Sequence, residues 1–369
     1  MLYYLFEYIN REFSPPGFDV FRFLTFRSAL AAITALLIAF YFGPKLIAYL
    51  QKKQIGESAK LEAPEGHRKK AGTPTMGGLI ILASVTIPVL LWGDILSIYI
   101  ILILGGTLWL GAVGFIDDYF KVVKKYKKGL IARYKLLGQF LIGLIVGLVI
   151  YFAPQFDGVA TLTTIPFFKN LNLDLSLFYV PAIIFVIMAT SNAVNLSDGL
   201  DGLAIGLIII VMLALAIVAY VSGNAIYSNY LNIIFLPGSG ELTVFIAALI
   251  GAALGFLWFN FYPAQIFMGD TGSLALGGAF GILAVLIKKE LLIPILGAVF
   301  FMETLSVIIQ TTYFKYTKKR TGEGKRVFKM APIHHHFELC GWQEPKIVIR
   351  FYILGIIFAI ISLASFKIR

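Results

Sequence analysis

The sequence contains little charge and almost no cysteine. Only 14% of its 369 residues are charged, against about 25% in a typical soluble protein. Its one cysteine, Cys340, excludes an internal disulfide and a metal site built from several thiolates. The first ten residues lack a basic stretch and a small-residue cleavage site, so we expect no signal peptide. The composition excludes an ordinary soluble globular domain and a disulfide-stabilised one.

Long apolar runs dominate the chain instead. Hydrophobic residues make up 59% of it, and a helix needs about 20 apolar residues to cross a bilayer. Ten segments come close to this length: 24–42, 76–92, 95–116, 136–152, 177–194, 203–221, 242–262, 271–287, 291–316 and 347–366. We therefore predict an all-α integral membrane protein with about ten transmembrane helices, folded as a single polytopic membrane domain over residues 1–369.

The lysines and arginines are distributed unevenly between the loops. Most of the 31 basic residues lie in or near the loops after the first, third and ninth predicted helices. Because basic loops stay on the cytoplasmic side, we expect both termini to be extracytoplasmic. The same distribution argues against a nucleic-acid binder, since the basic residues follow membrane topology. In the outer loop 153–176, rough alternation of apolar and polar residues predicts a small β-hairpin.

Polar side chains gather in the five loops that this topology assigns to the cytoplasm: 51–75, 117–135, 195–202, 260–273 and 317–346. Four of these loops bring carboxylates or histidines to the same membrane face. Each feature has a simpler explanation by itself, since an acid at a helix start is often only a cap. Their convergence on one face favours a shared site.

Asp117 and Asp118 stand side by side at the end of the third predicted helix. A helix C-terminus carries partial negative charge, so two acids there need a compensating cation. Nearby lysines, such as Lys121 and Lys125, or a bound metal would provide it. Adjacent helical residues point about 100° apart, so the two aspartates are expected to have different roles. Solvated helix-end acids are the alternative.

The last inner loop contains three consecutive histidines, which cannot all face one zinc ion for the same geometric reason. If a helix follows Pro332, then His334 and Glu338 lie on one face, four residues apart. Glu303 is the clear acid inside a predicted span, and such a residue is functional by default. A buried partner such as Gln310 would instead make Glu303 structural.

Carboxylates without cysteines, interleaved with lysines, suit a hard oxygen-binding cation. Mg²⁺ takes one or two carboxylates and leaves its other positions to water and phosphate oxygens, and phosphoryl transfer requires positive charge around the transferred group. The site is expected at the membrane surface, where a lipid phosphate and a soluble nucleotide meet. Transporters tend to bind near the bilayer midplane, so an ion-coupled transporter using Glu303 is the alternative from another class.

Six stretches resemble the polyprenyl-phosphate N-acetylhexosamine-1-phosphate transferases, in family order over most of the chain. They are KAGTPTMGG at 70–78, GFIDD at 114–118, NLSDGLDGL at 195–203, FYPA at 261–264, MGDTGS at 268–273 and APIHHHFE at 331–338. The triple histidine with its glutamate resembles the muramyl-pentapeptide branch of that family rather than the GlcNAc-1-phosphate branch.

The resemblance implies a reaction between UDP-MurNAc-pentapeptide and undecaprenyl phosphate that gives lipid I and UMP. It implies Mg²⁺ as cofactor, with Mn²⁺ as a substitute, and a ten-helix homodimer in the bacterial inner membrane with its active site on the cytoplasmic face. It also implies inhibition by uridine-based nucleosides. Transfer of GlcNAc-1-phosphate to the same lipid is the rival enzymatic hypothesis.

The family motifs also suggest roles for individual residues. Asp270 and Asp117 are the expected metal ligands, and Asp118 is expected to orient or deprotonate the lipid phosphate. The expected catalytic residues are Asp117, Asp118, Asp270, His334 and His335; those expected to bind substrate are Lys70, Thr75, Lys121, Lys125, Lys135, Asn195, Asp198, Asp201, Asn260, Phe267, Gly269, Gln310 and His336. Direct attack and a two-step route through a phospho-aspartate both stay open.

Overall fold

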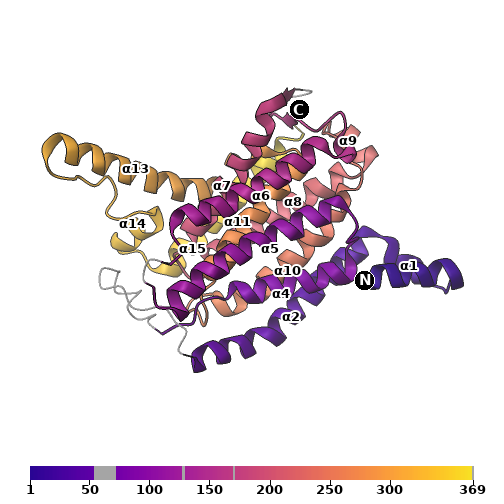
Figure 1. The fold of residues 1–369 in the computed structure, drawn as a ribbon, viewed down its shortest axis with the longest axis horizontal. Helices are drawn as coiled ribbons and strands as arrows, with labels where there is room; N and C mark the ends of the chain where they lie inside the picture. Colours follow the sequence, from indigo (N-terminus) through magenta and orange to yellow (C-terminus); the bar gives the residue numbers. More distant parts are fainter. Residues whose placement is uncertain (54–71, 127–128, 169–170, 368–369) are drawn as a thin grey trace.

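The computed structural model describes residues 1–53, 72–126, 129–168 and 171–367, which form a bundle of helices (Figure 1). The helices are α1 (Leu2–Phe13), α2 (Leu24–Lys52), α4 (Gly78–Trp92), α5 (Ile98–Asp118), α6 (Ala132–Phe152), α7 (Tyr179–Ser197), α8 (Leu203–Ser222), α9 (Ala225–Tyr230), α10 (Leu242–Asn260), α11 (Gly269–Leu286), α12 (Ile293–Leu296), α13 (Ala298–Thr321), α14 (Ile333–Leu339) and α15 (Glu344–Ala364). The predicted all-α class is confirmed.

The chain is a multi-pass membrane protein. Among the described residues, eight helices are long and apolar enough to cross a bilayer, and a bent helix pair makes a ninth candidate. The shorter apolar helix α4, of 15 residues, coincides with the remaining predicted segment. Each of the ten predicted segments therefore corresponds to a helix or a bent helix pair.

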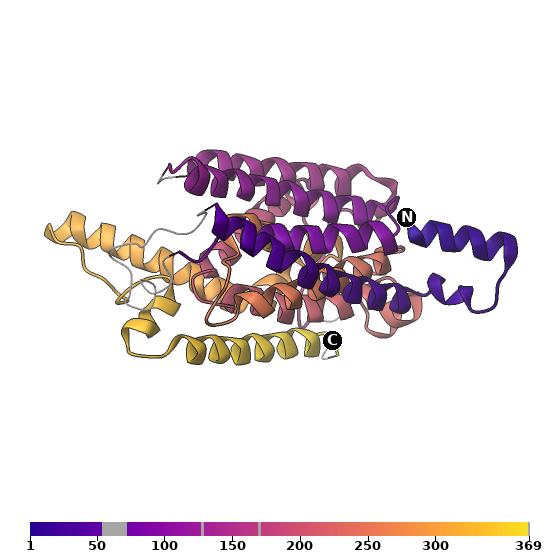
Figure 2. The ribbon, with the colours of Figure 1, turned by 90° about the horizontal axis from the view of Figure 1, so that it is seen from below.

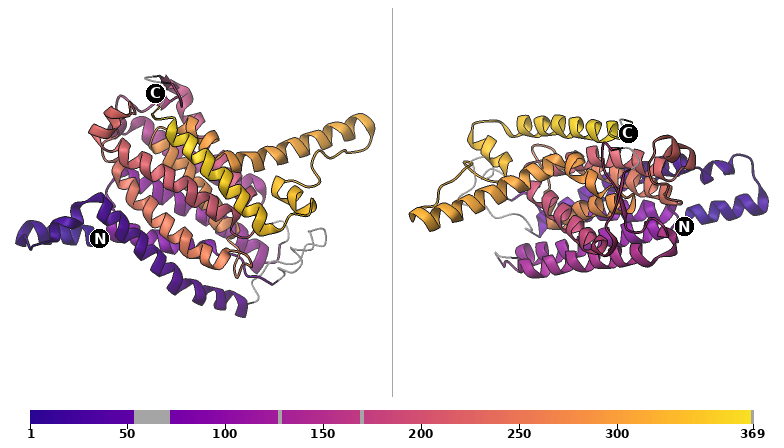
Figure 3. Two further views of the ribbon diagram at one scale, coloured as in Figure 1. Left: turned by 180° about the vertical axis from the view of Figure 1, so that it is seen from behind. Right: turned by 90° about the horizontal axis from the view of Figure 1, so that it is seen from above.

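The ninth predicted span differs most from expectation, because it is bent. The segments Glu290–Leu296 and Ala298–Thr321 meet at 81°. Pro294 lies in α12 and Gly297 at the break, and these residue types interrupt the hydrogen-bond ladder of a helix. As a result α13 projects away from the bundle, and α14 lies between it and α15 (Figures 1 and 3).

Helix α11 forms the centre of the bundle, and 89% of its residues are buried. It packs against α5, α7, α4 and α8. Close approach at its first turn depends on glycine, because a Cβ on Gly114 would stand 2.1 Å from the Asp270 carbonyl oxygen, and one on Gly78 would stand 2.1 Å from the Gly272 nitrogen. Small residues allow such backbone contact between membrane helices.

The outer helices flank this core. In Figure 2, α15 runs along one side and α6 along the opposite side, while α1 and the last residues of α15 lie toward the same end of the bundle. The predicted hairpin is present as β1 (Leu162–Thr164) and β2 (Asn172–Asp174), which pair antiparallel with Leu162 opposite Asp174.

Candidate active site

A cluster of two aspartates and two lysines lies where α5, α6 and α11 meet at one end of the bundle. Asp117, in the last turn of α5, has no solvent exposure. Its Oδ2 lies 2.5 Å from Lys121 Nζ and 2.7 Å from Lys135 Nζ, and its Oδ1 accepts a 2.6 Å hydrogen bond from Leu130 N. Both lysine ammoniums therefore offset the burial of this carboxylate.

Asp270 completes this aspartate–lysine cluster from the first turn of α11. Its Oδ2 lies 3.0 Å from Lys121 Nζ and also contacts Lys135 Nζ. Its Oδ1 accepts a 2.8 Å hydrogen bond from Asn195 Nδ2 at the end of α7. The side chain is 15% exposed, whereas Asp117 is fully covered. Asp270 is consequently the carboxylate that substrate can reach more easily.

Asp118 points to a different set of partners. Its Oδ1 accepts from Asp270 N at 3.1 Å, and its Oδ2 accepts from Thr271 N at 2.9 Å and Thr271 Oγ1 at 2.6 Å. These donors lie at the positive end of the α11 dipole, where a carboxylate is stabilised. The two adjacent aspartates therefore bind different partners, as their angle of about 100° around a helix predicts.

The same turn requires glycine at position 269. Gly269 has φ +72°, and a Cβ there would lie 2.6 Å from Asp118 Oδ2 and 3.0 Å from Thr75 Oγ1. Thr75 and Phe267 reach this turn through a short backbone pairing, in which Phe267 N donates to Pro74 O at 2.8 Å and Gly77 N donates to Phe267 O at 2.9 Å. The entry to α4 thus contacts the start of α11.

The carboxylates fit a hard divalent cation. Asp117, Asp118 and Asp270 each offer an oxygen within 4.8 Å of the others. Asp118 already binds three donors of α11, so Asp117 and Asp270 are the better ligands. Their Oδ2 atoms both face the two ammoniums, which marks a position where positive charge is stabilised. One or two carboxylates in a group of oxygen donors is the pattern that Mg²⁺ uses.

The loop after α7 and the segment after α10 are held together by two further predicted site residues. Asp201 Oδ2 accepts from Ala264 N at 3.0 Å. Asn260 accepts from Gly202 N at 3.1 Å and donates to Ile266 O at 2.8 Å. Asp198 lies in the same loop and is partly exposed. Asp201 and Asn260 therefore fix the backbone beside the cluster.

The histidines separate into three environments on and around α14. His334 is fully buried, with its Nδ1 3.0 Å from Glu303 Oε2. His335 Nδ1 lies 2.6 Å from Glu338 Oε2. His334 and Glu338 lie four residues apart on the helix that the sequence predicts, although His334 contacts Glu303 and Glu338 contacts His335. His336 Nδ1 accepts from Lys329 N at 3.1 Å. The helix itself begins after Pro332, as the sequence predicts.

Several predicted residues lie outside the aspartate–lysine cluster. Gln310 accepts hydrogen bonds from Val327 N and Phe328 N at 3.0 and 2.9 Å, so it braces the chain after α13 rather than pairing with Glu303. Lys125 is exposed. Lys70 lies outside the described residues. For these three residues, as for the other predicted site residues, a contact with substrate stays a prediction.

Three contacts of the site were not anticipated from the sequence. Thr271 binds Asp118, Ser273 Oγ accepts from Asn195 Nδ2 at 2.8 Å, and Leu130 N binds Asp117. The Gly-Asp-Thr-Gly-Ser stretch could have predicted that the two hydroxyls form hydrogen bonds, because small polar side chains at a helix start commonly form local ones. A backbone donor such as Leu130 leaves no signal in the sequence.

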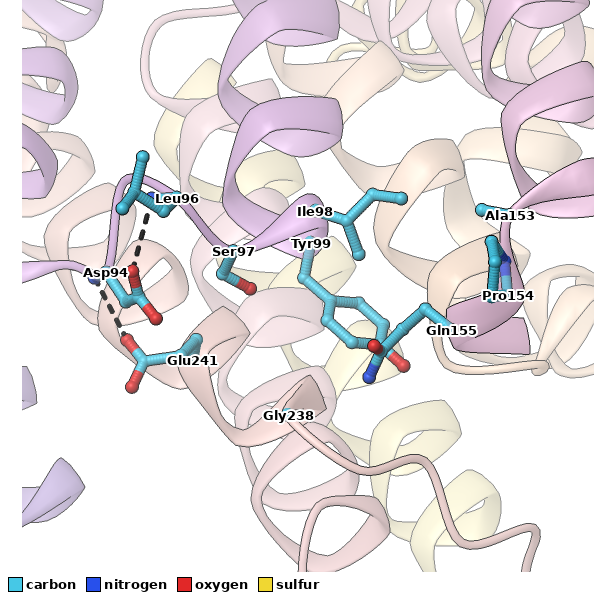
Figure 4. A pocket seen from close by; sticks show the side chains of 10 residues that line it. All are labelled: Asp94, Leu96, Ser97, Ile98, Tyr99, Ala153, Pro154, Gln155, Gly238 and Glu241. Atoms are coloured by element: carbon cyan, nitrogen blue, oxygen red, sulfur yellow. Dashed lines mark hydrogen bonds between the residues drawn. The ribbon is translucent and has the colours of Figure 1, made fainter. Parts of the chain in front are cut away.

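A cavity of about 450 Å³ lies at a different place, between the α4–α5 connection, the end of α6 and the start of α10. Its acids are already paired: Leu96 N donates to Asp94 Oδ1 at 3.1 Å and Asp94 N to Glu241 Oε2 at 3.2 Å (Figure 4). None of the predicted site residues lines it. This cavity is therefore separate from the aspartate–lysine cluster.

Comparison with known proteins gives this arrangement a class and then a family. Glycosyl transferase family 4 matches residues 100–288, a range that contains Asp117, Asp118 and Asp270, so the chain is a membrane-embedded glycosyl transferase. Signature 1 of the phospho-N-acetylmuramoyl-pentapeptide-transferases matches residues 70–82.

Relatives named phospho-N-acetylmuramoyl-pentapeptide-transferase align along the entire length of the chain. Those from Chlorobium chlorochromatii and Chloroherpeton thalassium are 56% and 52% identical, and one from Flavobacterium psychrophilum is 48% identical, each over 100% of both chains. The chain belongs to the phospho-N-acetylmuramoyl-pentapeptide-transferase family.

Proposed function

We infer that the protein transfers phospho-MurNAc-pentapeptide from UDP-MurNAc-pentapeptide to undecaprenyl phosphate, giving lipid I and UMP for peptidoglycan synthesis. Relatives named phospho-N-acetylmuramoyl-pentapeptide-transferase, which align with the chain over its full length, support this activity. The structural observation that carries it is the aspartate–lysine cluster, in which Lys121 and Lys135 each contact both Asp117 and Asp270. Transfer of a phosphoryl group needs this combination of cation-binding carboxylates and fixed positive charge.

The reaction is written as an attack by a lipid-phosphate oxygen on the β-phosphorus of the sugar nucleotide. A new P–O bond forms, the bond from the β-phosphorus to the bridging oxygen breaks, and its electron pair leaves with UMP. A phosphate monoester has a second pKa near 6, so the attacking group is largely dianionic at neutral pH. Positioning and charge stabilisation therefore matter more than proton removal.

Mg²⁺ is the proposed cofactor, with Mn²⁺ as a substitute, and Asp270 and Asp117 would hold it. When bound, such an ion neutralises charge that develops on phosphate oxygens. Lys121 and Lys135 would pair with phosphate oxygens from the same direction. Asp118 would orient the lipid phosphate while keeping the first turn of α11 in place.

The residues around the cluster are proposed to bind the rest of the two substrates. Asn195, Asp198 and Asp201 suit the nucleotide end, with Phe267 stacking on uracil. The remaining members of the predicted set are Lys70, Thr75, Lys125, Asn260, Gly269, Gln310 and the three histidines His334, His335 and His336.

We place the protein in the bacterial inner membrane, as a single polytopic domain with its active site on the cytoplasmic face. The support is the concentration of lysine and arginine in the loops that adjoin the cluster. A homodimer and sensitivity to uridine-based nucleoside inhibitors are further proposals that rest on the family.

Transfer of a radiolabelled sugar nucleotide into the lipid phase tests this function. Purified protein in detergent is given undecaprenyl phosphate with either UDP-MurNAc-pentapeptide or UDP-GlcNAc, with Mg²⁺ or with EDTA. We expect label in the lipid phase only with the muramyl substrate and Mg²⁺. Transfer of GlcNAc-1-phosphate alone, or full transfer in EDTA, would contradict the proposal.

A further inference from the structure

A buried carboxylate and imidazole connect α13 and α14 outside the aspartate–lysine cluster. Glu303 and His334 both have no solvent exposure. Glu303 Oε2 lies 3.0 Å from His334 Nδ1 and 3.4 Å from the His334 backbone nitrogen. Nδ1 is thus the ring nitrogen that faces Glu303, and Nε2 faces away from it.

This pair is incompletely bonded, which is unusual for a buried polar group. Within the described residues, Glu303 Oε1 and His334 Nε2 have no hydrogen-bond partner. Leaving a buried polar atom unpaired costs about 1–3 kcal/mol, and structural pairs are normally satisfied.

The free nitrogen of His334 is aimed at the loop after α7. A Cβ on Gly199 would lie 2.2 Å from His334 Nε2, so the imidazole rests directly against the backbone of this residue. Gly199 follows Asp198 and precedes Asp201, the acids proposed for the nucleotide end. The ring therefore sets how far the loop can move toward α14.

We propose that Glu303 is a positioning residue for nucleotide binding: through His334 it fixes the loop that carries Asp198 and Asp201. Glu303 holds the orientation of the ring, and the ring bears on Gly199. The role rests on the proposed transferase function and extends it to a residue that touches no substrate. It predicts that disturbing the pair raises the KM for the sugar nucleotide more than it lowers kcat.

Two variants disturb the contact from opposite sides. Glu303→Gln keeps a hydrogen-bonding oxygen but removes the charge that fixes the ring, and Gly199→Ala places a methyl group against Nε2. For each we expect the KM for UDP-MurNAc-pentapeptide to rise about tenfold, with kcat and the KM for undecaprenyl phosphate within threefold of wild type. Glu290→Gln, a buried acid in the same bent helix pair, is the matched control and should leave both KM values unchanged.

The double variant shows whether Glu303 and Gly199 affect nucleotide binding through the same contact or independently. If both residues act through His334, the KM of Glu303→Gln combined with Gly199→Ala rises by clearly less than the product of the single effects. Multiplicative effects, or a wild-type KM in folded Glu303→Gln protein, would overturn the proposal. If the wild-type protein itself transfers no label, the transferase function fails instead, so the two failures are separable.

Discussion

Two groups of charged side chains lie at the two ends of α11, and they are built differently. At its start, Asp117 and Asp270 share Lys121 and Lys135, and Asp270 stays partly exposed. Just after its end, the far-end cluster consists of Lys288, Lys289, Glu290, Tyr179, Thr163 and Thr164, all of them buried.

The far-end cluster is internally satisfied. Glu290 accepts from Tyr179 at 2.6 Å and from Thr163 at 2.5 Å, and Lys288 donates to Ala160 O and Tyr179 at 2.7 Å. Burial lowers the pKa of Lys288 to about 8, and the nearby charge of Glu290 opposes this shift. These bonds join the hairpin and the start of α7 to the segment between α11 and α13, which is a structural task.

The contrast shows that burial of charge is not by itself a sign of catalysis. In the far-end cluster, the polar atoms of Glu290 are bound by hydroxyl donors of the protein. In the aspartate–lysine cluster, two carboxylates turn oxygens toward the same pair of cations, and solvent reaches one of them. The second arrangement can exchange its partners for a metal ion and phosphates, whereas the first would only lose bonds.

The largest effect is expected from the aspartates at the start of α11. Asp270→Asn and Asp117→Asn keep the size of the side chain but remove the charge, and each should lower kcat at least about 100-fold. Radiolabel transfer by folded protein, checked by gel filtration and circular dichroism, measures this loss. Activity within threefold of wild type for both variants would show that the carboxylates are not part of the chemistry.

A smaller loss is expected from the lysines, and it should be unequal. Lys135 is 21% exposed and Lys121 is 38% exposed, so the charge of Lys135 is less screened by solvent. We expect Lys135→Met to lower kcat about 30-fold and Lys121→Met about tenfold, using the range for a charge-assisted bond. The reverse order, measured in the same assay, would show that exposure does not govern their contribution.

Thr271→Val tests the contact that separates Asp118 from its neighbour. The substitution removes the 2.6 Å hydrogen bond to Asp118 Oδ2 but leaves the two backbone donors. One lost bond to a charged group corresponds to about 1.5 kcal/mol, so kcat should fall about tenfold. Thr271→Ser restores the donor and serves as control. Equal activity of the valine and serine variants would show that this hydrogen bond does not contribute to catalysis.

The smallest effect on activity is expected in the far-end cluster. Glu290→Gln removes one charge from a buried group, which destabilises a fold by several kcal/mol. The thermal unfolding midpoint should therefore fall by about 5 °C or more, while kcat of the folded fraction stays within twofold of wild type. A large loss of kcat without a change in the midpoint would show that the far-end cluster contributes to catalysis rather than to stability.

The helices could be predicted from the sequence because lipid demands long apolar segments. The family motifs singled out Asp117, Asp118 and Asp270, whose carboxylates the fold brings within 4.8 Å of one another. The hairpin was also predicted correctly. The bend before α13 was not, although Pro294 and Gly297 mark it, because a proline or glycine inside a membrane helix is often tolerated. Contacts between residues far apart in the sequence were the hardest to predict. Glu303 with His334, and Lys135 with Asp117, depend on how the helices pack rather than on local sequence.

Binding of Mn²⁺, followed by electron paramagnetic resonance, tests the central claim most directly, because it compares the two clusters without relying on turnover. One titration series uses the wild-type protein, Asp270→Asn, Asp117→Asn and Glu290→Gln. We expect one bound ion per wild-type chain, weakened at least about tenfold in both aspartate variants and unchanged in Glu290→Gln. Equal binding by the wild type and a double Asp117→Asn, Asp270→Asn variant would contradict the assignment of the metal to the start of α11.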